Sequence, residues 1–186
     1  VDGSTISLLE PCQDHKQVGE GDTGANTGGM GAYCPTPLAD EATMDAVVRD
    51  VLVPTVDALK RDGIPFKGVL YAGLMLTPAG PKVLEFNTRF GDPETQPLMM
   101  RFQGDLVEVL WRCATGSLDE ASFTFDQRVA VCVAVCAEGY PGTPRKGDPI
   151  TGISAAEACA GDDEKVVVFH AGTTRRKDGT LVTNGG

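Results

Sequence analysis

Glycine and proline interrupt this sequence at short intervals, and this spacing limits the chain to short elements joined by tight turns. The 23 glycines and 12 prolines together approach a fifth of the 186 residues. They fall between apolar runs and form no low-complexity tract, so they mark turns within a folded chain. The sequence therefore predicts an α+β protein with several short strands and a few helices.

Two helices are predicted in the first two thirds of the chain. Apolar residues recur at three- and four-residue steps from 38 to 63, which is typical of an amphipathic helix. Pro54 should kink this helix or start a second segment, and Gly63 should end it. A further helix is expected from 104 to 114. Strands are expected at 4–9, 68–76 and 82–87, the last two joined by a tight turn.

The pattern of apolar and turn-forming residues changes after residue 116. Residues 127–142 form a mostly apolar run that ends sharply at glycine and proline, as a strand would. Residues 166–186 are typical of a hairpin whose turn is Lys177-Asp178-Gly179. A second, β-rich module is therefore expected to begin near residue 125.

The net charge limits the kinds of molecule that the protein can bind, and the cysteine pattern limits the kinds of metal site and compartment. The net charge of -10 argues against nucleic acid or an anionic membrane as partner, because both require a basic surface. A small molecule fits better, and a phosphate can still be bound by a few local cations and backbone N–H groups. The six cysteines lack the spacing of a zinc site, and we expect them to be reduced and largely buried in an intracellular compartment.

The segment VLEFNTRFGDPETQ (83–96) contains the side chains best suited to bind a metal ion and phosphate groups. If it begins as a strand, Glu85, Asn87 and Arg89 project to the same side, because side chains alternate along a strand. A carboxylate and an amide oxygen suit Mg²⁺, and a guanidinium suits phosphate oxygens. The alternative is the solvated face of an ordinary strand. The loop that follows favours chemistry, because Asp92 and Glu94 bring further polar groups to the same strand end.

The segment EGDTGANTGGMGAY (20–33) is the other unusual feature. Ordering so many glycines carries a large entropic cost, and the usual compensation is a turn with positive φ or close approach of the backbone to a ligand. A compact loop with only a structural role is the alternative.

These two segments together resemble one enzyme family. LEFNTRFGDPETQ (84–96) is similar to the signature of phosphoribosylamine-glycine ligases, and QDHKQVGEGDTGANTGGMGAYCPTP (13–37) is similar to an upstream motif of the same family. YAGLMLTPAGPKVLEFN resembles the connecting hairpin, and VFHAGTT with LVTNGG resembles the C-terminal domain. The resemblance implies the C-terminal lobe of an ATP-grasp domain, an antiparallel sheet with packed helices, over 1–116. A partial β-rich C-terminal domain would follow over 117–186.

The resemblance also implies an activity and its cofactors. Such an enzyme joins glycine to 5-phosphoribosylamine and cleaves ATP to ADP and phosphate through a glycyl phosphate, with Mg²⁺ or Mn²⁺ as the metal. Glu85 and Asn87 match the family's metal positions, and Arg89 would contact the transferred phosphoryl group. Asp92 and Glu94 would either contact the glycine or the amine, or brace the loop.

The glycine-rich segment and the residues before it would face the substrates. The residues expected there are Asp14, Lys16, Asn26, Thr27, Gly28, Gly29 and Gly31. Backbone N–H groups of such a segment can approach an anion. Asp14 and Lys16 could equally be loop residues without substrate contact.

The resemblance leaves part of an ATP-grasp enzyme unaccounted for. The lobe that covers the ATP phosphates and the N-terminal domain are expected before Val1, and the final Asn184-Gly185-Gly186 turn has no strand after it. We therefore expect a chain truncated at both ends, partnered by the missing N-terminal portion and inactive alone. The alternative is a binding or scaffold module in a larger assembly. A cytoplasmic location is expected, with an organellar matrix as the alternative.

Overall fold

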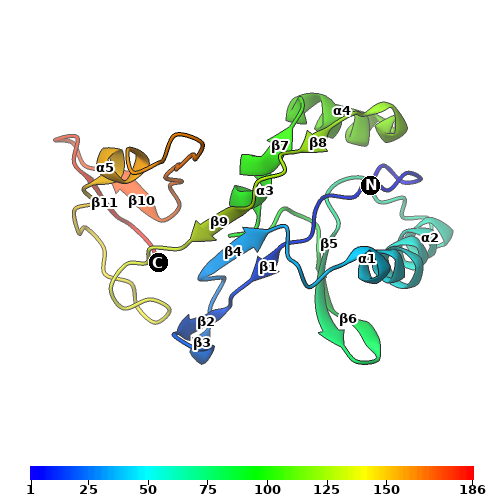
Figure 1. The fold of residues 1–186 in the computed structure, drawn as a ribbon, viewed down its shortest axis with the longest axis horizontal. Coiled ribbons are helices and arrows are strands. Elements are labelled where there is room, and N and C mark those ends of the chain that lie inside the picture. The colour runs from blue at the N-terminus through cyan, green and yellow to red at the C-terminus, as the bar shows by residue number, and fades with distance from the viewer. The chain divides into compact units, whose positions relative to one another are not determined.

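The computed structural model describes residues 1–186, and the chain divides into two compact units (Figure 1). The first unit comprises residues 1–15 and 31–133, and the second comprises residues 16–30 and 134–186. The sequence predicts a boundary after residue 116 between two domains of the family. This boundary differs from the division into compact units. It stays a prediction.

A three-stranded antiparallel sheet lies in the first unit, with the order β1 (Gln13–Asp14), β4 (Gly31–Cys34) and β9 (Ala130–Val133). Gly31 pairs with Val133 and Ala32 with Cys132. A Cβ atom on Gly31 would lie 2.6 Å from the carbonyl oxygen of Cys132, so only glycine lets β4 approach β9 this closely.

The predicted hairpin is confirmed. It pairs β5 (Tyr71–Thr77) with β6 (Gly80–Asn87) in antiparallel register, from Thr77 opposite Gly80 to Tyr71 opposite Asn87. The register shifts between Gly73 and Leu74, as at a β-bulge. The turn is tight because Gly80 adopts a φ of 93°.

The predicted amphipathic helix is present and is divided where proline falls. It consists of α1 (Glu41–Val47), a π-helical segment (Val48–Leu52) and α2 (Val53–Arg61). Pro54 lies in the first turn of α2, where the missing N–H costs little, and the wider preceding turn accommodates the ring. Gly63 follows the helix with a φ of 75°, which confirms the predicted stop.

Two more helices follow the hairpin, and the sequence predicts only the second of them. α4 (Leu106–Thr115) confirms this prediction, and the Asp105 side chain caps it by accepting from the N–H of Glu108 at 3.1 Å. The unpredicted helix is α3 (Thr95–Arg101), which begins inside the segment expected to be a polar loop. Two short strands, β7 (Phe102–Gln103) and β8 (Thr124–Phe125), pair beside them.

The predicted strand at 4–9 is wrong. Those residues lie outside every helix and strand. The Asp2 carboxylate accepts hydrogen bonds from the N–H groups of Ser4 and Thr5 at 3.0 and 2.8 Å. A side chain that binds the following backbone in this way folds it into a turn and removes the donors that a sheet would need.

The second unit contains short elements only. Its hairpins are β2 (Gln17–Gly19) with β3 (Thr23–Asn26), and β10 (Thr173–Arg175) with β11 (Leu181–Thr183). The β10–β11 hairpin confirms the predicted turn at 177–179. The expected strand over 127–142 is limited to β9, and α5 (Ile153–Glu157) was not predicted.

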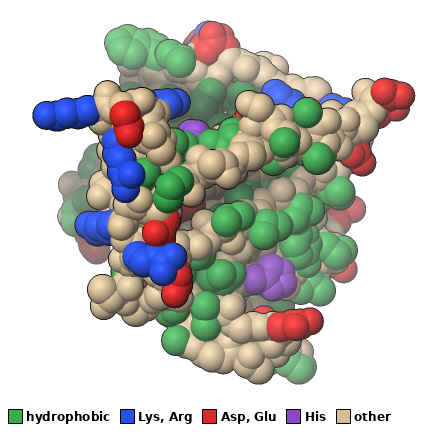
Figure 2. Space-filling model, turned by 90° about the vertical axis from the view of Figure 1, so that its left-hand side faces the viewer, with side chains coloured by type: hydrophobic (Ala, Val, Ile, Leu, Met, Phe, Trp, Pro, Cys, Tyr) green, Lys and Arg blue, Asp and Glu red, His purple; other side chains and the backbone are tan.

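The surface carries charges of both signs. On the face drawn in Figure 2, Lys and Arg side chains gather beside Asp and Glu side chains, while hydrophobic side chains occupy another part. Among the ion pairs of the second unit, Arg145 contacts Glu138 at 2.5 Å and Asp148 at 2.7 Å. Among the helices of residues 1–186, none has the length and apolar character needed to cross a membrane.

Candidate functional site

The end of β6 carries the two predicted metal ligands side by side. The Asn87 side-chain amide donates to Oε1 of Glu85 at 3.1 Å, so both side chains lie on the same side of the strand. This confirms the local geometry predicted for these two residues. Glu85 is exposed and Asn87 is half-buried, which leaves the pair reachable from solvent.

The neighbouring strand leaves room above Glu85. Gly73 of β5 lies opposite Glu85, and a Cβ atom on Gly73 would come within 3.1 Å of Cγ of Glu85. A larger residue at this position would therefore have to push the Glu85 side chain aside. This gives Gly73 a role in the site that the sequence analysis did not assign.

Tyr71 and Glu94 form a second polar contact in the same part of the unit. The Tyr71 hydroxyl donates to Oε1 of Glu94 at 2.6 Å, and Glu94 is only 7% exposed. Burial raises the pKa of Tyr71 well above its ordinary value, and the hydrogen bond to Glu94 and the charges of Glu94, Asp14 and Glu85 raise it further. Three carboxylates thus lie around one phenol.

Tyr71 is a residue that the sequence analysis missed, because an aromatic residue in an apolar strand is usually part of the core. Its position opposite Asn87 follows from the hairpin register and could have identified it. Gly91 completes the packing, since a Cβ atom there would lie 2.3 Å from Oε2 of Glu94. These contacts support the bracing alternative for Glu94.

Arg89 departs from the predicted alternation. β6 ends at Asn87, so Arg89 lies in the bend after the strand, where its Nη1 donates to the carbonyl oxygen of Phe90 at 2.8 Å. The expectation that it continues the row on the strand is wrong, because the strand stops two residues earlier. Asp92 is exposed and accepts from the side-chain amide of Gln96 at 2.8 Å.

The other predicted residues of the first unit are Asp14 and Gly31. Asp14 is half-buried in β1, where it pairs with Ala32 of β4. Gly31 is buried in β4, and its close approach to Cys132 explains the glycine without a ligand.

The remaining predicted residues belong to the second unit, where their backbone is held by protein groups. Thr27 donates from its N–H and its hydroxyl to the carbonyl oxygen of Lys16, at 2.7 and 2.8 Å. The N–H of Gly29 donates to the Thr27 hydroxyl at 3.0 Å, and the N–H of Gly28 donates to the Tyr140 hydroxyl at 3.2 Å. Two N–H groups expected to face an anion are therefore already bonded.

Asn26 and Lys16 complete this group. Asn26 ends β3, pairs with Gln17 and is exposed, as is the Lys16 side chain. Tyr140 was not predicted at all, because it lies more than a hundred residues along the chain from the glycine-rich segment that it contacts.

Comparison with known proteins identifies the family. The model of the phosphoribosylglycinamide synthetase ATP-grasp (A) domain matches residues 1–95, which is more than half of the chain. The chain belongs to the phosphoribosylglycinamide synthetase family. The model of the same family's C domain matches residues 130–186. The resemblance stated from the two motifs is thus confirmed, as is the α+β ATP-grasp fold class.

Individual relatives of this synthetase family agree. The chain is 59% identical to the phosphoribosylamine-glycine ligase of Rhodopirellula baltica and 50% identical to that of Caulobacter vibrioides, in each case over 100% of the chain and 42% of the relative. The crystal structure of a phosphoribosylamine-glycine ligase from Thermotoga maritima matches with a TM-score of 0.77 and 32% identity. That match covers 100% of this chain and 44% of that one. The chain therefore spans less than half the length of these relatives.

The donor set on β6 fits a hard divalent cation such as that expected for an ATP-grasp synthetase. Glu85 offers a carboxylate and Asn87 an amide oxygen, which are oxygen ligands of the kind that Mg²⁺ prefers. Across residues 1–186, no three His, Cys, Asp or Glu side chains are grouped so as to hold a metal. A cation at Glu85 and Asn87 would therefore take its remaining ligands from phosphate oxygens and water, as Mg²⁺ usually does.

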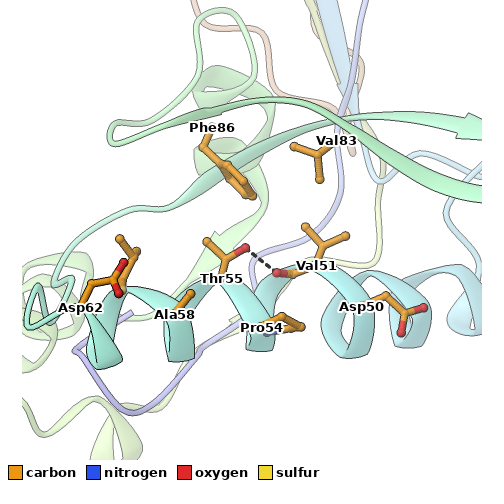
Figure 3. A pocket seen from close by; sticks show the side chains of 9 residues that line it. Asp50, Val51, Pro54, Thr55, Ala58, Asp62, Val83 and Phe86 are labelled. Carbon is orange, nitrogen blue, oxygen red and sulfur yellow. Dashed lines mark hydrogen bonds between the residues drawn. The ribbon is translucent and has the colours of Figure 1, made fainter.

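The opposite face of β6 lines a groove of a different character (Figure 3). The groove has a volume of about 370 Å³ and lies between β6 and the helix that ends in α2. Its lining residues are Asp50, Val51, Pro54, Thr55, Ala58, Leu59, Asp62, Val83 and Phe86. The mostly apolar lining suits packing against another apolar surface and does not resemble the polar face with Glu85.

Proposed function

We propose that the protein containing this chain ligates glycine to 5-phosphoribosylamine, giving glycinamide ribonucleotide, with cleavage of ATP to ADP and phosphate through a glycyl phosphate. The observation that carries this proposal is the contact of Glu85 with Asn87 on β6, within the region that matches the ATP-grasp domain. The names of the relatives supply the substrates.

Glu85 and Asn87 would hold Mg²⁺ or Mn²⁺ together with the ATP phosphates, and the metal would supply charge neutralisation for phosphoryl transfer. Arg89 lies at the end of the same strand and is exposed. It could turn from the carbonyl oxygen of Phe90 towards the transferred phosphoryl group, where a guanidinium stabilises the charge that develops.

The carboxylates after β6 would act in different ways. Asp92 is exposed and is proposed to contact glycine or the amine of the sugar. Glu94 is buried beneath Tyr71 and is proposed to hold the loop in place, so that it acts through position rather than by contact.

The glycine-rich segment is proposed to face the sugar phosphate and glycine. The residues proposed for this role are Asp14, Lys16, Asn26, Thr27, Gly28, Gly29 and Gly31. Because the N–H groups of Gly28 and Gly29 have protein partners, the exposed side chains of Lys16 and Asn26 are the stronger candidates for direct contact.

An ATP-grasp site is built between two lobes, and the chain spans 42% of the first relatives. We propose that residues 1–116 are the C-terminal portion of the ATP-grasp domain and residues 117–186 are part of the C-terminal domain. The lobe that covers the ATP phosphates would be supplied by sequence outside residues 1–186. A cytoplasmic location and the absence of a nucleic-acid or membrane partner are proposed with it.

Phosphate release tests the proposal. The protein is incubated with ATP, Mg²⁺ and freshly generated phosphoribosylamine, with and without glycine. The proposal predicts phosphate release that requires both glycine and phosphoribosylamine. Binding of the nucleotide with no release under any of these conditions would contradict it and would favour a binding or scaffold module.

A further inference from the structure

Two cysteines of the first unit lie where the pairing of β1 with β4 ends: Cys12 directly precedes β1, and Cys34 is the last residue of β4. β1 pairs with β4 so that Gln13 faces Tyr33 and Asp14 faces Ala32, and the same register places Cys12 opposite Cys34. The strands remain adjacent beyond this pair, because the N–H of Thr36 donates to the carbonyl oxygen of Pro11 at 3.0 Å. Figure 1 shows β1 and β4 side by side.

The hydrogen-bond pattern places this pair at a narrow position of the ladder. The N–H of His15 donates to the carbonyl oxygen of Gly31 at 2.9 Å, so His15 and Gly31 form a hydrogen-bonded pair. Bonded and non-bonded pairs alternate along antiparallel strands, which makes Cys12 and Cys34 a non-bonded pair. Cα atoms of such pairs lie about 4.5 Å apart, within the range of about 4.4–6.8 Å that a disulfide spans.

The two thiols also influence each other. A hydrogen bond between the Cys12 and Cys34 side chains lowers the pKa of Cys12, and the same bond together with burial raises the pKa of Cys34. Cys12 is half-buried, whereas the Cys34 side chain is 0% exposed. An oxidant from solution can therefore reach Cys12 first, and Cys12 is also the thiol that ionises more readily.

Two charged groups lie against the Cys34 sulfur. Nη1 of Arg101 lies 3.3 Å from its sulfur, and Oε2 of Glu10 lies 3.7 Å from it and can take its proton. Arg101 is buried, donates to the carbonyl oxygens of Arg128 and Asp126, and forms an ion pair with Glu10. The sulfur is thus held in place between Arg101 and Glu10, and the Glu10 carboxylate can accept the proton that Cys34 releases when it attacks another sulfur.

We propose that Cys12 and Cys34 form a reversible intramolecular disulfide by exchange with a low-molecular-weight disulfide. The Cys12 thiolate attacks one sulfur of the small disulfide, and one small thiol leaves. Cys34 then gives up its proton, attacks the Cys12 sulfur and displaces the second small thiol. Two protein thiols are oxidised and one small disulfide is reduced to two thiols. The crosslink fixes β1 to β4 two residues before Asp14, a candidate substrate residue.

Oxidised glutathione provides the test on the native wild-type protein. After incubation, free thiols are alkylated, the protein is digested without reductant, and the peptides are identified by mass spectrometry. The expected product joins the Cys12 peptide to the Cys34 peptide with a loss of two hydrogens, and dithiothreitol separates them. In Cys34→Ser, a glutathione adduct should remain on Cys12, because no second thiol is present to displace it.

Exposed Cys159 is the internal control, because its reaction shows that the oxidant is active. Two results in the wild-type protein would overturn the proposal. One is a stable glutathione adduct on Cys12 with Cys34 still alkylatable after unfolding. The other is that Cys12 and Cys34 both remain thiols under conditions that modify Cys159.

Discussion

At the scale of single residues, the candidate site depends on Tyr71 as much as on the acidic side chains. Its hydroxyl holds Glu94 in a nearly buried position, and its ring lies against Gly91 and Gly73. A buried carboxylate without a donor is costly, so this hydrogen bond fixes the loop that follows β6.

Removal of the Tyr71 hydroxyl should therefore destabilise the protein. We expect Tyr71→Phe to lower the free energy of unfolding by about 1–3 kcal/mol, because Glu94 loses its donor while remaining buried. Urea denaturation at neutral pH measures the change. Tyr140→Phe is the matched control, because its hydroxyl contacts an exposed N–H group and its loss should cost less. Equal effects of the two variants would contradict this account of Tyr71.

The same hydroxyl gives a prediction for alkaline pH. The folded-state pKa of Tyr71 is raised above its ordinary value of 10.0, so its contribution to stability is complete below that pH and is lost as the pH rises through the folded-state pKa. We expect the stability difference between wild type and Tyr71→Phe to be constant from about pH 7 to about pH 9 and to shrink above about pH 10. A difference that grows above this pH would show that the assigned direction is wrong.

At the scale of elements, the sequence predicted those that local patterning determines. The β5–β6 hairpin and α4 each carry a clear period and a clear end signal, and Asp105 marks the start of α4. α3 was missed because it begins at the end of the polar FGDPET segment (90–95), and its apolar residues are too few to set a period. The strand at 4–9 failed because Asp2 bonds to the backbone ahead of it.

The site residues, too, were predicted where a local pattern determines them and were missed where it does not. The alternation that put Glu85 and Asn87 on one side held as far as the strand continued, and it failed at Arg89 because the strand had ended. Tyr140 and its contact with Gly28 join segments far apart in sequence, and no local pattern encodes such a contact.

Gly31 tests the packing of β4 against β9. We expect Gly31→Ala to lower the free energy of unfolding by about 1–3 kcal/mol, because the new methyl group would overlap the carbonyl oxygen of Cys132. Thermal unfolding measures the effect. Gly161→Ala is the control, because its methyl group would meet only the end of the Glu164 side chain, at 3.4 Å. Wild-type stability of Gly31→Ala would contradict the close approach of the strands.

At the scale of the whole molecule, the matches to two domains of one family link the candidate site to the proposed activity. The region that matches the ATP-grasp domain contains the Glu85–Asn87 pair, Tyr71 and the acidic loop to Glu94. The region that matches the C domain, residues 130–186, includes Tyr140, whose hydroxyl holds the glycine-rich segment. Both matched regions therefore contribute contacts that shape the proposed substrate-binding residues.

The central claim is that the oxygens of Glu85 and Asn87 bind the catalytic divalent cation. The most direct measurement is the Mg²⁺ concentration needed for half-maximal glycine-dependent phosphate release, compared between wild type, Glu85→Gln and the control Glu41→Gln, whose side chain is exposed in the first turn of α1. We predict an increase of about tenfold or more for Glu85→Gln and no change for Glu41→Gln. An unchanged Mg²⁺ requirement in Glu85→Gln, with wild-type turnover, would contradict the account.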